Sequence, residues 1–475
     1  MKNFKNILYS YKQSKILHTS FIVAILTAVL FFGFFLRDYY IAKFFGFSRE
    51  SDRFYLVSTI PMFLVGIFCI PFGQVIMPFF DKIKKPQFSL AISYFFSISI
   101  VFCLILCFIA YALYDVLYLF KGHPFQLSDK LALLAFLPLL LLSGWLILCN
   151  SILLHQKHYL LPNIAQLIVP LLAICFLFFF ASSIGVYSVI LGMVLGQFFN
   201  LMIIKSALKK EKIFFRGFIF QPPDDLKKVF WTGYIYLVII AIFNSVNIPL
   251  STFIASSLGG GAVSIFNLGI KFNLFFCGLF TVVFSSVFLP YFSKIFNSSG
   301  AIDLHRETLF LLFFTSVFLI PFSALAFFFS DDLTFLIFHQ IIKENSSILA
   351  LSSVIKYSLI QLPFWVFNII ILKHGNVMNR MELIALVSII ISVLNLIFSL
   401  FFIKFMNVGG LSFSMALSTG IGSFLLLLYC LKQRYLNFLH GVTILLVWCS
   451  FIGLTIILNQ EKFLAFLKKF LASYD

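Results

Sequence analysis

Apolar stretches of about 20 residues recur along the whole chain, and they limit its fold more than any other feature. About 20 consecutive apolar residues are needed for a helix to cross some 30 Å of hydrocarbon. Of the 475 residues, 61% are hydrophobic and only 11% are charged, and the mean hydropathy is +1.06. Soluble domains have about 25% charged residues, and a β-barrel would show short alternating segments instead. The sequence therefore predicts an all-α polytopic membrane protein.

Hydropathy windows predict six spans in the first half, six in the second and one more near the C-terminus. The expected ranges are 17–36, 54–79, 89–114, 131–154, 159–181, 184–204, 229–256, 262–290, 307–330, 347–372, 381–403, 411–431 and 440–459. The tail after them, QEKFLAFLKKFLASYD, is too short and too charged to cross the hydrocarbon. We expect it to form an amphipathic helix at the interface.

The positive charge is distributed unevenly between the predicted loops. The formal net charge is +17, and the loops on the N-terminal side hold 21 Lys and Arg residues against 8 on the opposite side. The positive-inside rule then places the N-terminus in the cytoplasm. The basic surplus faces anionic membrane lipids, so we expect no nucleic-acid partner.

The two halves of the chain resemble each other. Without gaps, 54–83 aligns with 266–295, and eleven of the 30 positions are identical, including the pairs Gly66/Gly278 and Pro78/Pro290. The copies are separated by six spans, an even number, so both run in the same direction. Such parallel repeats are related by an axis along the membrane normal and build transporters with a substrate site between the halves.

The most charged interior loop, 205–228, contains Pro222–Pro223 and follows the sixth span. It is predicted to be a basic cytoplasmic linker. The expected organisation is an N-terminal six-helix lobe over 1–204, this linker, a C-terminal six-helix lobe over 229–435, and an extra transmembrane helix with the amphipathic tail over 436–475.

Few ionisable residues fall inside the predicted spans, and the deepest are cations. Lys271 and Lys356 each lie about nine residues into a span, or about 13 Å deep at 1.5 Å per residue. Buried charges of this kind usually face a cavity or a partner, although a lysine can also extend its ammonium to the interface. In the repeat alignment Lys271 matches Thr59, so the cation is present in one copy only. Arg37, at the end of the first span, either contacts substrate or pairs with the adjacent Asp38.

Other polar residues in the spans have a structural interpretation beside a functional one. Asn244 and Asn247, near Pro249, predict an irregular stretch beside a substrate cavity, and most other polar residues in spans are expected to bond between helices. Asp52 is expected to cap the N-terminus of the second span. All eight cysteines lie in apolar spans, which predicts neither a disulfide framework nor a metal site.

The sequence shows no sign of an enzyme. It has no GxxxxGK[ST] loop for a nucleotide, and neither HExxH nor GxSxG. Exporters that expel cations need acidic residues at mid-membrane, whereas the charges buried here are positive and favour an anionic substrate. We expect a transporter without a cofactor, driven by a coupling ion or the membrane potential, whose identity the sequence does not give.

At this point the motifs resemble those of a known family. RDYYIAKFFGFSRESDRFYLVSTIP followed by FGQVIMP is similar to the start of the MurJ (MviN) lipid II flippases of the MOP transporter superfamily. The second half contains GGGAVSIFNLGIKFNLFFCGLFTVVFSSVFLP and LNLIFSLFFIKFMNVGGLSFSMALSTGIGS, which are similar to later helices of that family. The resemblance covers most of residues 25–435. The matching motif positions are Arg37, Asp38, Gly46, Asp52, Phe54, Pro61, Phe72, Gln74 and Pro78, with Gly278 and Pro290 in the second half.

The resemblance implies a two-lobed, V-shaped flippase that moves undecaprenyl-diphosphate-linked peptidoglycan precursor by alternating access. Arg37 and Lys271 match basic positions of the family's cavity, which makes Lys271 a diphosphate-facing charge. The full set of substrate-binding candidates is Arg37, Lys271, Lys356, Asn244, Asn247 and Gln74. We expect the protein to be a monomer.

This sequence departs from the family pattern at some charged positions. Two further arginine positions fall on Phe31 and Val65, and a glutamate position falls on Ile70. These departures leave open a Wzx-like flippase of O-antigen or capsule precursors. A multidrug exporter of related fold, or a scaffold for envelope assembly without transport, also remains as an alternative.

Overall fold

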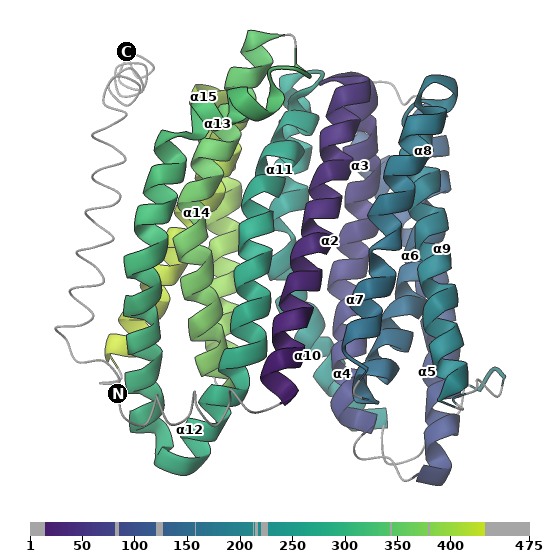
Figure 1. Ribbon diagram of the computed structural model, residues 1–475, viewed down its shortest axis with the longest axis vertical. Coiled ribbons are helices and arrows are strands. Elements are labelled where there is room, and N and C mark those ends of the chain that lie inside the picture. The colour runs from purple at the N-terminus through teal and green to yellow at the C-terminus, as the bar shows by residue number, and fades with distance from the viewer. Residues whose placement is uncertain are drawn as a thin grey trace. The chain divides into compact units, whose positions relative to one another are not determined.

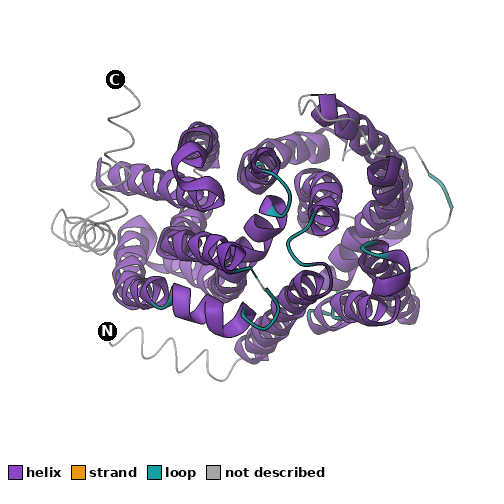
Figure 2. Ribbon diagram, turned by 90° about the horizontal axis from the view of Figure 1, so that it is seen from above, coloured by secondary structure: helices purple, strands orange, loops and turns teal. Residues whose placement is uncertain are grey.

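The computed structural model describes residues 15–80, 85–119, 127–156, 158–211, 213, 217–219, 227–342, 344–378 and 381–432. Within these ranges the chain is helical apart from short connections, and no strand occurs (Figure 2). The all-α class predicted from the apolar runs is therefore confirmed. The predicted span 440–459 and the tail after it lie outside the described residues.

The chain divides into two compact units, residues 1–264 and 265–475. Their helices are labelled in Figure 1. The first unit contains α2 (Lys15–Phe45), α3 (Arg49–Leu64), the π-helical segment η1 (Val65–Cys69), α4 (Ile70–Phe80), α5 (Lys85–Leu119), α6 (Leu127–His155), α7 (Leu160–Gln166), α8 (Ile168–Ile184), α9 (Tyr187–Lys210), α10 (Lys227–Ser245), α11 (Asn247–Ala255) and the 3-10 turn η2 (Ser256–Leu258). The first turn of α12 (Ala262–Phe328) also belongs to it. The second unit contains the rest of α12, α13 (Ser330–Phe338), α14 (Asn345–Val377) and α15 (Met381–Lys432).

Each predicted span from 17–36 to 411–431 coincides with described helix. Ten of the described stretches are long and apolar enough to cross a membrane. Two long helices each cover two predicted spans. A residue with non-helical backbone angles divides each of them, Gly300 (φ 83°) in α12 and Asn407 (φ 49°) in α15. The short helix α13 was not predicted, because its sequence SDDLTFLIF is too polar at its start to read as a span.

The packing division falls after Ser264 and not in the basic segment 205–228. The physical reason is that α10 and α11 pack against α3, η1 and α4. The ring of Phe72 in α4 lies 5.6 Å from Phe230 and 5.8 Å from Tyr234, both in α10. The two units are defined by contacts within each unit, which do not test whether the two halves have equivalent helices. The two six-helix lobes inferred from the repeat therefore stay a prediction.

Small residues let two helices of the first unit approach each other closely. Gly192 and Gly196, one turn apart on α9, face α8, where an added Cβ would lie 2.7 Å from the Cα atoms of Ala173 and Val169, respectively. This G-x-x-x-G spacing is a common device of membrane helix pairs, because small residues allow close backbone contact where lipid gives no hydrophobic driving force. The contact fixes α9 against α8.

The connection from α2 to α3 is short and fully bonded. Gly46 has a φ of 61° and its N–H donates to the carbonyl of Ala42 (2.9 Å), which ends α2 with a left-handed residue. Ser48 is the N-cap of α3 and forms a reciprocal capping box with Ser51. The expectation that Asp52 caps its own span is therefore wrong, because Ser48 already occupies that position.

The two carboxylates in the first turn of α3 instead bond to other helices. The carboxylate of Asp52 accepts from the N–H groups of Gly261 (2.6 Å) and Ser264 (2.7 Å) at the start of α12, and from the Ser264 hydroxyl. The carboxylate of Glu50 accepts from the N–H of Val186 (2.9 Å), the N-cap residue of α9. Both anions meet the positive end of a helix dipole.

In the second unit, α14 packs against α12 and α15 through glycines. Gly269 on α12 faces Val354 of α14, and Gly409 on α15 faces Ser353 with no room for a Cβ. The two halves of α15 also pack on each other, since Gly422 faces Ile391. The segments before and after Asn407 are therefore two antiparallel helices, as the spans 381–403 and 411–431 predict.

We predict that Asp52→Ala lowers the stability of the protein by about 1–3 kcal/mol. The reason is that the buried N–H groups of Gly261 and Ser264 lose their acceptor. The measurement is the thermal unfolding temperature of the purified full chain in detergent. Asp332→Ala is the control, because Asp332 is an exposed acid in the first turn of α13. Equal unfolding temperatures for the two variants would contradict the capping role.

Candidate functional site

Arg37, the first cavity cation expected from the sequence, is buried and paired. Its guanidinium donates through Nε (2.9 Å) and Nη2 (2.6 Å) to one carboxylate oxygen of Asp38. Nη1 lies 3.4 Å from the sulfur of Met193 on α9. The guanidinium also lies over the rings of Phe34 and Phe54, at 5.3 and 5.5 Å from their centroids. Of the two readings that the sequence left open, the structure shows the pair.

This pair has unused hydrogen-bonding capacity. Arg37 is 7% exposed and Asp38 is fully buried. The second carboxylate oxygen of Asp38 is buried and has no hydrogen-bond partner. A buried acceptor without a partner costs about 1–3 kcal/mol. A substrate role for Arg37 stays a prediction and requires the pair to rearrange.

Three further candidates lie in the first unit at less buried positions. The side chains of Gln74 on α4 and Asn244 on α10 are exposed, and Asn247 is half-buried. The two asparagines flank Val246, where the helix is interrupted between α10 and α11. Pro249 contributes to this break because it has no N–H to donate to the preceding turn. The predicted irregular stretch is confirmed, whereas contact with substrate stays a prediction.

Apart from Gly46, which ends α2, the proline and glycine positions of the motif lie inside helices. Pro61 is buried in α3, one turn before the π-helical segment η1. Such π-bulges concentrate at functional sites. Pro78 lies in α4, and Gly278 and Pro290 lie in the first half of α12.

Lys356, on α14, is half-buried and has two partners in the second unit. Its ammonium lies 3.6 Å from a carboxylate oxygen of Asp331 at the start of α13 and 4.8 Å from the ring centroid of Phe327. Asp331 also accepts from the hydroxyl of Ser352. Lys356 is therefore a partly neutralised cation.

Lys271, on α12, is half-buried. It lies two residues after Gly269, where α12 meets α14. Two residues along a helix differ by about 200°, so Lys271 projects away from this contact, and by the same argument Lys356 projects away from Val354. The structure thus places the two lysines on neighbouring helices without bringing their side chains to the shared contact.

The second unit also contains a buried polar chain that the sequence did not predict as a unit. Asn273 donates to the side-chain oxygen of Gln361 (3.1 Å), and Gln361 donates to the hydroxyl of Thr419 (3.0 Å). These residues link α12, α14 and the second half of α15. Asn273 was recognised as a polar residue in a span, but Gln361 is 88 residues away from it, so the pattern along the chain gave no signal for this pairing.

Two buried histidines form a second unpredicted contact. Nδ1 of His305 and Nε2 of His374 are 2.6 Å apart, which is a hydrogen bond between α12 and α14. No group of three or more His, Cys, Asp or Glu side chains suited to a metal ion occurs in the part of the chain that the structure describes.

Comparison with known proteins adds the family. The family model described as "Lipid II flippase MurJ" matches residues 41–474. A probable lipid II flippase MurJ of Buchnera aphidicola subsp. Baizongia pistaciae (strain Bp) is 24% identical over 408 residues, covering 82% of this chain and 79% of that protein. Another, of Aquifex aeolicus (strain VF5), is 24% identical over 451 residues, covering 91% and 87%.

Solved structures agree at the level of the fold. A lipid II flippase MurJ in an inward closed conformation is similar with a TM-score of 0.71 and 19% identity, covering 97% of this chain and 99% of that chain. An inward-facing multidrug resistance MATE family transporter of the MOP superfamily has a TM-score of 0.66 and 13% identity, covering 87% and 94%. The family match extends from within α2 almost to the C-terminus, so the chain belongs to the MurJ family of lipid II flippases.

Proposed function

We propose that this protein translocates lipid II, an undecaprenyl-diphosphate-linked saccharide, across the bacterial inner membrane by alternating access. The observation that carries the proposal is the family match over residues 41–474. The buried charges support it, because a diphosphate is an anion and Lys271 and Arg37 are cations in membrane-spanning helices. An ion pair in such a water-poor site is stronger than one at a surface.

Within this proposal the cations have different tasks. Lys271 is the first diphosphate contact, because it lies well inside its helix and is only half-buried. Arg37 becomes available when its bond to Asp38 rearranges. Lys356 is already engaged in part, because Asp331 and Phe327 contact its ammonium.

A second lipid-linked glycan is an alternative substrate. Apolar Phe31 and Val65 stand where the family pattern has arginines, so the headgroup pocket is less basic than the family pattern implies. That feature favours an O-antigen or capsule precursor with a different sugar. The likeness to multidrug transporters concerns the fold alone. The driving force, a coupling ion or the membrane potential, and the monomeric state are part of the same proposal.

The proposed orientation has the N-terminus in the cytoplasm. We predict that a cysteine at Phe218, in the basic segment, is protected from a membrane-impermeant thiol reagent in intact cells, while one at Ser257 is labelled. Both side chains are exposed. The background is a variant without the eight native cysteines, and permeabilised cells provide the control in which both positions react. Labelling of Phe218→Cys alone in intact cells would contradict this orientation and indicate the opposite one.

Substitutions that keep, remove or reverse the charge of Lys271 test its substrate role. In a bacterial strain depleted of its own lipid II flippase, we predict that Lys271→Arg restores growth, Lys271→Ala restores it weakly and Lys271→Glu not at all. Arginine keeps a cation for the phosphate, whereas glutamate places like charges together. The measurement is growth by complementation, with the membrane level of each variant determined alongside.

The matched control is Lys404→Glu, which makes the same charge reversal at an exposed lysine on α15. It is expected to complement like the unmodified protein. Full growth with Lys271→Glu at a normal membrane level would remove Lys271 from the substrate path.

A further inference from the structure

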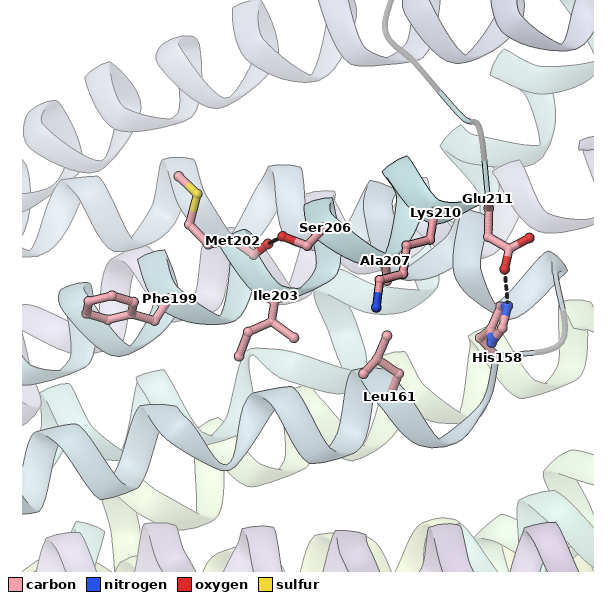
Figure 3. A pocket seen from close by; sticks show the side chains of 9 residues that line it. All are labelled: His158, Leu161, Phe199, Met202, Ile203, Ser206, Ala207, Lys210 and Glu211. Atoms are coloured by element: carbon pink, nitrogen blue, oxygen red, sulfur yellow. Dashed lines mark hydrogen bonds and ion pairs between the residues drawn. The ribbon is translucent and has the colours of Figure 1, made fainter.

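The first unit also contains a groove that is lined by none of the substrate candidates. It lies between the start of α7 and the second half of α9 and has a volume of about 480 Å³ (Figure 3). Its floor and walls are apolar over most of their length, formed by Leu161 on α7 and by Phe199, Met202 and Ile203 on α9. The volume is in the range of ligand-binding pockets.

The groove faces the lipid. Phe199 is 47% exposed, and Met202 and Ile203 are each 39% exposed, on a helix that is long and apolar enough to span the membrane. From Phe199 to Lys210 the groove follows eleven residues of α9, which is about 16 Å at 1.5 Å per residue. That length is about half of the 30 Å hydrocarbon thickness. The groove therefore extends through one leaflet, from the interface to the midplane.

Charged groups are confined to the interfacial end of the groove. The ammonium of Lys210 lies over the groove and is directed toward Leu161 (Figure 3). No ion-pair partner of Lys210 occurs among the described residues. The nearby carboxylate of Glu211 is 2.9 Å from Nε2 of His158, so it is engaged by another side chain. Lys209, on the same last turn of α9, adds a second exposed cation outside the groove lining.

We propose that this groove is a binding site for one anionic glycerophospholipid, with an acyl chain along Leu161, Met202 and Ile203 and the headgroup phosphate at Lys210. Charge complementarity supports this occupant, since the groove joins an apolar trough one leaflet deep to an ammonium at headgroup level that has no ion-pair partner within the described part of the chain. Basic pockets between membrane helices on the cytoplasmic side bind anionic headgroups. The site is separate from the transported substrate, so it stands whether or not the substrate is lipid II.

The test measures lipid binding to the full-length protein by native mass spectrometry. The probes are dioleoylphosphatidylglycerol and dioleoylphosphatidylcholine, which have the same acyl chains and differ in headgroup charge. We expect the protein to prefer the anionic lipid by about five-fold, which corresponds to about 1 kcal/mol per basic residue near an anionic headgroup. Lys210→Ala should reduce that preference to near one, while Lys209→Ala, the matched control from the adjacent position, should leave it.

A second pair of variants tests the trough. Ala207→Phe places a large ring in the groove, because Ala207 lines it, and should reduce binding of both lipids. Leu195→Phe adds the same ring on the exposed side of α9 outside the groove and should leave binding unchanged. Equal loss of preference in Lys209→Ala and Lys210→Ala, or unchanged binding in Ala207→Phe, would overturn the proposal and leave only general attraction of lipid to a basic surface.

Discussion

The placement of two carboxylates in the first turn of α3 is the interaction on which the first unit depends most. Asp52 bonds to the N–H groups of Gly261 and Ser264, and Glu50 bonds to the N–H of Val186. Helix N-termini have N–H groups without partners inside the helix, and lipid offers none. One turn of α3 therefore provides the acceptors for N–H groups at the starts of both α12 and α9. The Gly-rich connection before α12 fits against the same turn, since a Cβ on Gly261 would lie 2.6 Å from the carbonyl oxygen of Phe47.

The helical spans were predictable because membrane helices are encoded locally, by about 20 apolar residues each. Contacts distant in sequence were not. Asp52 was expected to cap its own helix, but its carboxylate accepts from the N–H groups of Gly261 and Ser264, 209 and 212 residues later, and nothing along the chain indicates those partners. The same holds for the chain from Asn273 through Gln361 to Thr419. Arg37 and Asp38 show a different limit: adjacency made pairing and substrate contact equally consistent with the sequence, and only the geometry shows the pair.

The distribution of charge connects the fold to the proposed transport. The described spans contain Arg37, which is paired with Asp38, and the half-buried lysines Lys271 and Lys356, of which Lys356 lies 3.6 Å from Asp331. A carrier must bind an anionic headgroup and release it again, and a cation that can exchange an internal carboxylate for a phosphate is suited to such reversible binding. Membership of the MurJ family gives this chemistry a substrate class.

The most direct measurement of the central claim is translocation of lipid II by the purified protein in liposomes. Fluorescent lipid II is placed in both leaflets, and the fraction accessible to an impermeant quencher is followed with time, in parallel with liposomes containing an O-antigen-type undecaprenyl-diphosphate glycan. The account predicts exchange of lipid II between leaflets that depends on the protein and is slowed by Lys271→Glu. Exchange of the other glycan alone, or no exchange of either lipid by a correctly folded protein in the presence of a membrane potential, would contradict it.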